Sequence, residues 1–443
     1  MNVLLLTHRY PPDGVGGVER YTESLAAGLA ATGDRVTVLT RRPTHLPRRP
    51  RATADVRDGV RVVCIEGSGV RLGDPLAGHE RTEAILAALL AELKPAVVHV
   101  NHLLGLSPRS ISLAKQAGCG VVVTVPDYFY ACPRLHLRRT DGQDCDGPRR
   151  GEECARTCFV HQRCALERWT ARAAYFADAL RTADYVLCPT EEVAAFFRLF
   201  APGVEVRVLP LSVEMPRLPR SPCAADGLRP LRLLTIGSIQ RQKGVHLLIE
   251  ALAAARLGAV ELTVAGPVDD ARYAKELRAA AGKVPGLHLE GLKPSERQAL
   301  AHLLSHADAF VFPSIAREVF PLAPREALAA GVPIVTSRVG GLDELVVDGQ
   351  NGLFVEPADT KGFAETLRRL TDEPGLLECL QSGAAATLVV GTDDHVSRLR
   401  ELYRGLAARP RSSGRMREDS LFAALEGAWS RRGRRRQFAQ IRL

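Results

Sequence analysis

Short apolar runs alternate with helical segments along the first half of the chain. The run at residues 3–6 has the length of a buried strand, and residues 18–32 have the apolar spacing of a helix that Gly33 ends. Further apolar runs of strand length follow at residues 36–39, 97–100, 121–125, 185–188 and 206–209. Because parallel strands buried on both faces are apolar throughout, this alternation predicts a parallel sheet covered by helices.

The second half of the chain repeats this pattern after a segment rich in proline. Residues 216–230 contain four prolines, which is typical of a linker. Strands are then expected at residues 231–236, 261–265, 288–291, 309–312 and 333–336, with helices at 245–255 and 326–330. We therefore expect an α/β protein with two Rossmann-like doubly wound domains, at residues 1–215 and 231–392. They should face a cleft in which the carboxyl ends of the strands bind the ligand.

Composition supports a globular protein of several domains. The chain has 443 residues, of which 46% are hydrophobic and 25% charged, so each domain can bury a sizeable core. No apolar run reaches the roughly 18–20 residues that a membrane span requires. The opening apolar run is short and is soon followed by Pro11 and Pro12, which does not fit a signal peptide. We expect a cytoplasmic protein.

The net charge of +9 is concentrated at one end of the chain. Residues 409–443 carry ten arginines against three acidic residues and so contribute +7. The remainder is nearly neutral, which argues against a nucleic-acid-binding body. In this basic tail, Leu421, Phe422, Leu425 and Trp429 would share one face of a helix that precedes an arginine run. Such a helix suits an anionic membrane surface, at the inner face of the plasma membrane, although a solvated tail or a helix packed on the body is the alternative.

Two glutamates are the first candidate for chemistry. Glu318 and Glu326 stand eight residues apart, and we expect Glu326 in the first turn of a helix and Glu318 in the loop before it. Carboxylates accept hydrogen bonds from hydroxyl groups, and a helix start offers free N–H groups to a phosphate. The pair therefore suits a polyhydroxyl, phosphorylated ligand. A loop charge and a helix-capping acid remain the alternative.

Residues 318–341 (EVFPLAPREALAAGVPIVTSRVGG) resemble the C-terminal signature of the retaining glycosyltransferases of family four, which have the two-domain GT-B fold. The resemblance covers most of residues 1–405. It implies a hexosyltransferase that moves a sugar, with retention, from a nucleotide-diphosphate sugar to a glycan, a lipid-linked molecule or a small molecule. It also implies that the second domain binds the donor and the first the acceptor, and that a helix at residues 393–408 returns to the first domain.

The resemblance assigns roles to individual residues. Glu326 matches the acid that binds the nucleotide ribose, Glu318 the acid beside the scissile bond, and Lys243 the lysine that neutralises the leaving diphosphate. Fixed cations can offset the charge that this group gains, so catalysis requires no metal cofactor. Ser238 stands where the family usually has arginine, and we expect Arg241 to replace it. Further donor-binding residues implied by the match are Gly16 and Gly17 of a glycine loop, Gly237, Phe320, Pro321 and Leu322.

Two departures from the family pattern affect function. Pro126 stands where the family commonly has a histidine, and proline can neither transfer a proton nor donate a hydrogen bond. Asp127 and His102 are left as the candidate catalytic and acceptor-contacting residues. Pro321 stands where many members have glycine, which removes one N–H group from the donor site. A non-catalytic homologue that binds sugar nucleotides, or a nucleotide-sugar epimerase of the same fold, is the alternative.

Half of the ten cysteines lie in a polar insertion at residues 131–165. Because a cytoplasmic chain keeps its thiols reduced, a cluster favours a metal over disulfides. Cys132, Cys145, Cys154 and Cys158 could form a four-thiolate site, and we expect a structural zinc ion there. Buried free thiols and an iron–sulfur cluster are the alternatives. A similar insertion occurs in one branch of the resembled family.

Overall fold

The computed structural model forms two compact units, and each is described by itself. The first unit comprises Met1–Ser212 and Thr392–Leu443, and the second unit comprises Val213–Gly391. The boundaries lie close to the expected ones, and the linker predicted at residues 216–230 is mostly outside the described part. The residues that the structure describes are 1–14, 16–42, 51–66, 79–147, 149–162, 164–216, 219, 229–268, 270–285, 287–292, 297–409, 421–425 and 428.

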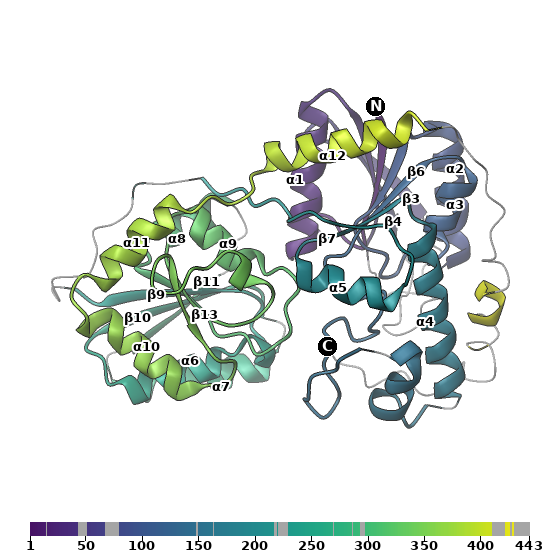
Figure 1. Ribbon diagram of the computed structural model, residues 1–443. Helices are drawn as coiled ribbons and strands as arrows, with labels where there is room; N and C mark the ends of the chain where they lie inside the picture. Colours follow the sequence, from purple (N-terminus) through teal and green to yellow (C-terminus); the bar gives the residue numbers. More distant parts are fainter. Residues whose placement is uncertain are drawn as a thin grey trace. The chain divides into compact units, whose positions relative to one another are not determined.

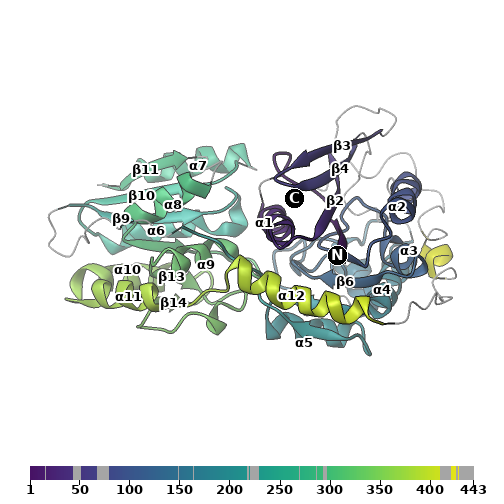
Figure 2. The ribbon, with the colours of Figure 1, turned by 90° about the horizontal axis from the view of Figure 1, so that it is seen from above.

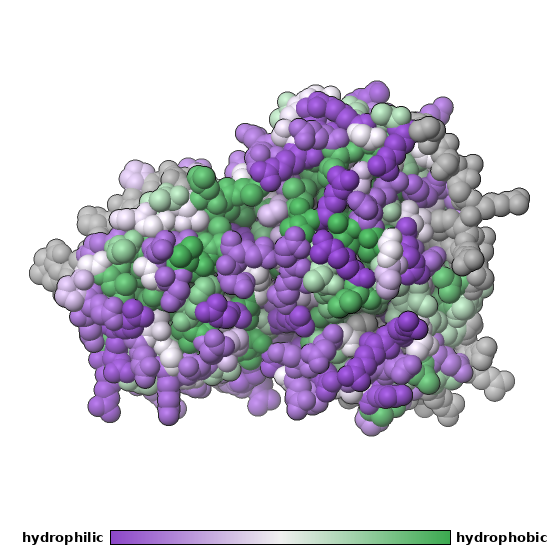
Figure 3. All heavy atoms as spheres, viewed as in Figure 1, coloured by the Kyte–Doolittle hydropathy of each residue, from purple (hydrophilic) through white to green (hydrophobic). Residues whose placement is uncertain are grey.

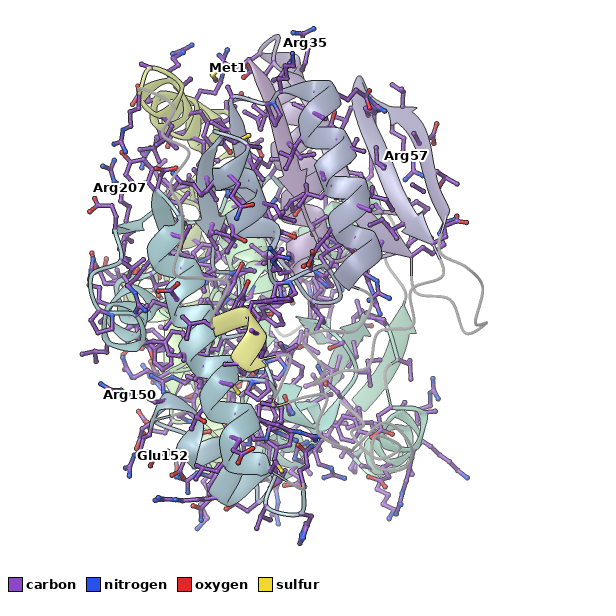
Figure 4. All side chains as sticks on the ribbon, turned by 90° about the vertical axis from the view of Figure 1, so that its right-hand side faces the viewer. Met1, Arg35, Arg57, Arg150, Glu152 and Arg207 are labelled. Atoms are coloured by element: carbon purple, nitrogen blue, oxygen red, sulfur yellow. The ribbon has the colours of Figure 1, made fainter. Side chains whose placement is uncertain are left out.

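The first unit is built on a sheet of eight strands in the order β3-β4-β2-β1-β5-β6-β7-β8. All neighbours are parallel except β3 and β4, which pair antiparallel. The edge strand β3 carries charged residues, such as Arg57 in Figure 4, that discourage pairing with another sheet. The strands are β1 Asn2–Leu6, β2 Arg35–Arg42, β3 Arg51–Arg57, β4 Val60–Glu66, β5 Val97–Val100, β6 Gly120–Thr124, β7 Tyr185–Cys188 and β8 Val206–Val208.

Helices of the first unit include one from the far end of the chain. They are α1 Gly17–Ala31, α2 His79–Leu93, α3 Ser110–Gln116, α4 Ala165–Thr182, α5 Glu191–Phe200 and α12 Thr392–Ala407. Figure 1 shows α12 crossing α1, against which it packs, although more than 350 residues separate them in the sequence. The chain therefore returns to the first unit through a helix, close to residues 393–408 where such a helix was expected.

Polar contacts hold α12 on the first unit. Arg400 Nε donates to Asp34 Oδ2 at 2.8 Å, and Tyr21 OH lies 2.8 Å from His395 Nε2. The Tyr403 hydroxyl bonds to Nδ1 of the fully buried His99. Because each pair joins α12 to a different segment of the first unit, this helix is part of that unit's core.

The second unit contains a six-stranded sheet with the order β11-β10-β9-β12-β13-β14, all parallel. Counted from β9, this is the order 3-2-1-4-5-6 of the Rossmann fold, which confirms the predicted fold class. The strands are β9 Leu231–Ile236, β10 Val260–Ala265, β11 Leu287–Leu292, β12 Ala309–Phe312, β13 Ile334–Ser337 and β14 Gly352–Val355.

Apolar residues on both faces of this second sheet are buried. Leu233 packs in one core cluster and Leu234 in another, so successive residues of β9 face opposite layers. The helices, seen from above in Figure 2, are α6 Val245–Ala255, α7 Ala271–Ala281, α8 Arg297–His306, α9 Leu322–Ala329, α10 Thr360–Asp372 and α11 Leu376–Ala386. Burial on both faces explains why the strands appear as continuous apolar runs in the sequence.

The cysteine-rich insertion packs at one end of α4. Gly151 lies so close to this helix that a Cβ atom there would be 2.1 Å from the Trp169 carbonyl oxygen, and the ring of Phe159 stacks on Trp169 with centroids 4.0 Å apart. Figure 4 shows Arg150 and Glu152 beside this end of α4. The insertion is therefore stabilised by apolar contacts with α4.

The apolar face of the C-terminal tail packs on the body, which was the alternative to a membrane-facing helix, and association of the tail with a membrane stays a prediction. Leu425 is fully buried, the ring of Phe422 lies 5.7 Å from that of Tyr175 on α4, and Arg168 Nε donates to the Ala428 carbonyl at 3.1 Å. Figure 4 shows this short helix against α4. Trp429 and the arginine run lie outside the described residues.

Among the described residues, no helix is both long enough and apolar enough to cross a membrane. Hydrophilic residues cover much of the face drawn in Figure 3, with apolar residues between them. In the second unit, exposed charged positions along α7 and α10 contribute hydrophilic surface.

Candidate active site

In the second unit, two predicted site residues meet where the strand order reverses. β9 and β12 are neighbours at this switch point, where open α/β sheets bind their ligands. Lys243 follows β9 in a short 3-10 turn, Arg241–Lys243, and Glu318 follows β12. Lys243 Nζ lies 2.6 Å from Glu318 Oε1, which also accepts a hydrogen bond from Ser314 Oγ at 2.7 Å. We call these three residues the Lys243 cluster.

Glycines let the loops approach one another around the Lys243 cluster. Gly244 has φ +70°, and a Cβ atom there would be 1.8 Å from the Pro313 carbonyl oxygen. Gly340 has φ +65°, and a Cβ atom there would be 2.6 Å from Glu318 Cβ. Any larger residue at either position would displace backbone that holds Lys243 or Glu318.

Glu326 lies in the second turn of α9, so its predicted place in the first turn is wrong. The helix begins at Leu322, directly after Pro321, and Pro324 is accommodated in the first turn because N–H groups there have no partner within the helix. Two prolines, rather than the glutamate, therefore fix where the helix starts. Phe320, Pro321 and Leu322 lie at this start, and their donor-binding role stays a prediction.

Arg325 on the same helix is a structural residue that the sequence did not single out. It is buried, and its guanidinium donates to the carbonyl oxygens of Pro321 and Gly341, both at 3.0 Å. It also lies 3.6 Å from the centroid of the Phe320 ring. Burial lowers the pKa of Arg325 to about 9. The side chain thus joins the start of α9 to the Gly340–Gly341 turn.

Arg241 is not brought to the Lys243 cluster. Its guanidinium pairs with Glu276 on α7 at 2.7 Å and lies over the ring of Tyr273. Ser238 Oγ accepts a hydrogen bond from Gln240 Nε2 at 2.7 Å, and Gly237 ends β9 beside it. The replacement of the family's usual arginine by Arg241 therefore stays a prediction that would require the pair with Glu276 to open.

The first unit has its own switch point, between β1 and β5. Gly16 is the N-cap of α1 and Gly17 its first residue, so the glycine loop lies at this edge. His102 follows β5, and its Nε2 donates to Asp127 Oδ2 at 2.9 Å, while its Nδ1 accepts the Leu104 N–H at 2.9 Å. The two predicted residues are therefore in contact, and both nitrogens of His102 are occupied.

The environment of Asp127 favours its charged form. Burial opposes ionisation, but the hydrogen bonds from His102 and from the Phe129 N–H outweigh it and hold the pKa of Asp127 below the usual range. Pro126 beside it offers no polar side-chain atom. Asp127 thus holds the ring of His102, whose side chain is 2% exposed. The hydrogen-bonded pair in turn holds the residues around it in place.

His8 and Glu19 complete this group, although the sequence analysis gave neither a role. His8 lies two residues beyond β1, its Nε2 is 3.3 Å from Glu19 Oε1, and its ring centroid is 4.4 Å from that of His102. The sequence feature that could have identified His8 is its position just after a predicted strand, at the same sheet edge as His102. We call His8, Glu19, His102 and Asp127 the His8 cluster.

Comparisons with known proteins agree with this arrangement. The model of the family "Glycosyl transferases group 1" matches residues 227–386, and that of "Glycosyl transferase 4-like domain" matches residues 16–212. Glycogen synthase of Mycobacterium tuberculosis is 32% identical over 400 residues, which span 84% of this chain and 87% of that protein. The chain belongs to the retaining glycosyltransferases of family four. The predicted enzyme class is thereby confirmed, and the non-catalytic and epimerase alternatives are not supported.

Solved structures confirm the GT-B fold of this glycosyltransferase. Sucrose-phosphate synthase from Thermosynechococcus elongatus superposes with a TM-score of 0.65 at 20% identity and covers 92% of this chain and 99% of its own. The Anabaena protein Alr3699/HepE, solved in complex with UDP-glucose, has a TM-score of 0.64 at 16% identity, with 91% of this chain and 100% of its own covered. At these identities the likeness concerns the fold.

The described part of the cysteine insertion contains no arranged metal site. Cys132, Cys145, Cys154 and Cys158 are all free thiols, and electrostatic coupling links Cys154 to each of the other three. Burial raises the pKa of Cys154 to about 12. Within the described ranges, no three His, Cys, Asp or Glu side chains are grouped as metal ligands. The structural zinc ion therefore remains a prediction, which metal analysis of the purified protein would test.

Proposed function

We propose that this glycosyltransferase moves a sugar from a nucleoside diphosphate sugar to a hydroxyl group of a glycan. The second unit would bind the donor and the first unit the acceptor. The contact of Lys243 with Glu318 at the switch point of the second sheet carries the proposal. Similarity over most of the chain to a glycogen synthase supports a glycan acceptor, and a neighbouring fold solved with UDP-glucose supports the donor class.

The chemistry follows from charge development. When the bond between the sugar carbon and the diphosphate breaks, negative charge accumulates on the leaving oxygen, and the Lys243 ammonium would offset it. Glu318 holds that ammonium through one carboxylate oxygen and can face the donor sugar with the other. Glu326 would accept hydrogen bonds from the ribose. The acceptor hydroxyl then bonds to the sugar carbon with retention, and its proton passes to the oxygen of the leaving diphosphate.

A donor screen followed by transfer assays tests this proposal. UDP-, ADP- and GDP-glucose are offered to the purified protein, with maltoheptaose as the acceptor probe, and transfer is followed by product mass. Lys243→Ala should reduce kcat by about 100- to 1,000-fold, because one fixed charge that stabilises the transition state is removed. The matched control is Lys275→Ala, an exposed lysine on α7. Unchanged transfer by Lys243→Ala would contradict the site.

A further inference from the structure

His8 has a ring nitrogen that is buried and without a partner among the described residues. This atom is Nδ1. Both nitrogens of His102 are occupied, by Asp127 and the Leu104 N–H, and both nitrogens of His99 are occupied, by Tyr403 and Thr124. An unpaired buried polar atom is costly and uncommon in folded proteins, and a ligand is one means of satisfying it.

The neighbours of His8 determine which of its nitrogens carries the hydrogen. Nε2 faces the Glu19 carboxylate, which can only accept a hydrogen bond, so Nε2 is the donor. Burial lowers the pKa of His8. Burial also opposes ionisation of Glu19, but the contact with His8 holds the pKa of Glu19 below its usual value. The ring is therefore neutral near pH 7, and Nδ1 presents a bare lone pair.

The charges around this lone pair select the kind of ligand. A lone pair accepts from a hydroxyl group and repels a phosphate oxygen, and the carboxylates of Glu19 and Asp127 repel anions further. Other titratable groups surround these two carboxylates. Arg9 interacts with Glu19, and Asp127 interacts with His136, Tyr130 and Arg172. The cluster thus fits a neutral polyhydroxyl molecule.

We infer that His8 is an acceptor-binding residue, whose Nδ1 accepts a hydrogen bond from a hydroxyl group of the acceptor sugar while Glu19 fixes its tautomer. The inference rests on the proposed transfer to a glycan. The side chain is 16% exposed and Nδ1 itself is covered, so the hydroxyl reaches it through a local displacement. His102 and Asp127 then act as positioning residues behind His8, because the nitrogens of His102 are already bonded.

Two substitutions of His8 separate binding from a structural role. Asn places an amide group where Nδ1 lies, whereas Gln places one where Nε2 lies. Loss of the acceptor at Nδ1 in His8→Gln should raise the maltoheptaose KM about tenfold, the size of one hydrogen bond, while His8→Asn should stay within about threefold of the unmodified protein. Donor affinity, measured by calorimetry with the nucleotide sugar that supports transfer, should not change in either. His302→Gln, an exposed histidine on α8, is the matched control.

Glu19→Gln gives a second, independent test. It removes the charge that fixes the tautomer of His8 and should also raise the maltoheptaose KM, without changing donor affinity. If His8 served only to hold Glu19, His8→Gln would be tolerated and His8→Asn would not, and this reversed order would overturn the inference. Equal KM values in all variants would overturn it as well. No transfer by the unmodified protein would instead contradict the proposed glycan acceptor.

Discussion

The two units use the same architecture for opposite chemistry. Each has a doubly wound sheet, and in each the candidate residues follow the two strands at the switch point, β1 and β5 in one unit, β9 and β12 in the other. The second unit places an ammonium there, which suits a diphosphate. The first unit places neutral imidazoles backed by carboxylates, which suit hydroxyl groups. Topology thus determines where a ligand binds, and a few loop residues determine its charge.

Burial also distinguishes the histidines that hold α12 on the first unit from the Lys243 cluster. His99 and His395 of the first unit are almost completely buried, whereas Lys243 and Glu318 retain 24% and 15% exposure. A fully buried base is a permanent part of the fold, while partly exposed charges can exchange partners with a ligand. The first unit should therefore respond to pH through its stability, and the second through its binding site.

The largest effect is expected from acid on the first unit. Burial lowers the pKa of His99 to about 3 and that of His395 to about 4. In the unfolded chain both titrate near 6.5, so below that pH the unfolded state binds protons that the folded state does not. Each histidine should then reduce the free energy of unfolding by about 2 kcal/mol between pH 7.5 and pH 5, or about 4 kcal/mol together.

Urea unfolding followed by tryptophan fluorescence measures this loss. Trp169 lies in the first unit, and residues 213–391 contain no tryptophan, so the signal excludes the second unit. His395→Gln should remove about half of the pH dependence, and the exposed control His302→Gln none. A pH dependence identical in His395→Gln would show that other groups cause it.

A smaller effect is expected from adding one methyl group to the second unit. Gly340→Ala places a Cβ atom at φ +65°, against Glu318, and should cost about 2–3 kcal/mol of stability. It should also weaken donor binding at least about tenfold, because the backbone of Glu318 must shift. Circular dichroism and calorimetry give the two values. Gly258→Ala, where a Cβ atom meets nothing within 4 Å, is the control, and equal behaviour of both variants would refute this account.

The smallest effect is expected from a substitution in the C-terminal helix, which belongs to the first unit. Leu425→Ala removes a fully buried side chain at the edge of the fold, and local undocking should limit the loss to about 1 kcal/mol. Hydrogen exchange along α4 should increase. The exposed Ala424→Ser should leave exchange unchanged. Unaltered exchange in Leu425→Ala would mean that docking of this helix does not protect α4.

Most of the fold could be predicted because strands buried on both faces leave continuous apolar runs. Lys243 and Glu318 follow two such runs, so their place beyond the carboxyl ends of strands was predictable, whereas their contact depends on the adjacency of β9 and β12, which chain order does not give. Three strands were not predicted. The edge strand β3 has a polar face that leaves only a weak alternation in Arg51–Arg57, whereas β4 and β14 are apolar runs that the prediction left out. Other errors concern local detail: prolines, not Glu326, set the start of α9.

The role of His8 could not be predicted because it depends on three separate segments. Its partners are on α1 and beyond β5, and the pairing of β1 with β5 brings them together. The C-terminal helix shows the same limit. Its apolar face was evident in the sequence, but a pattern of apolar positions does not reveal whether a membrane or another helix will cover it.

The return of α12 to the first unit has a consequence for synthesis. The eight strands of that unit are complete at Val208, yet Tyr21, Asp34 and His99 have partners on α12, beyond residue 391. A ribosome must therefore make the entire second unit before it makes the helix that completes the first. The part of the enzyme that emerges first is finished last, and during that interval its exposed helix-binding face is the surface that a chaperone would have to protect.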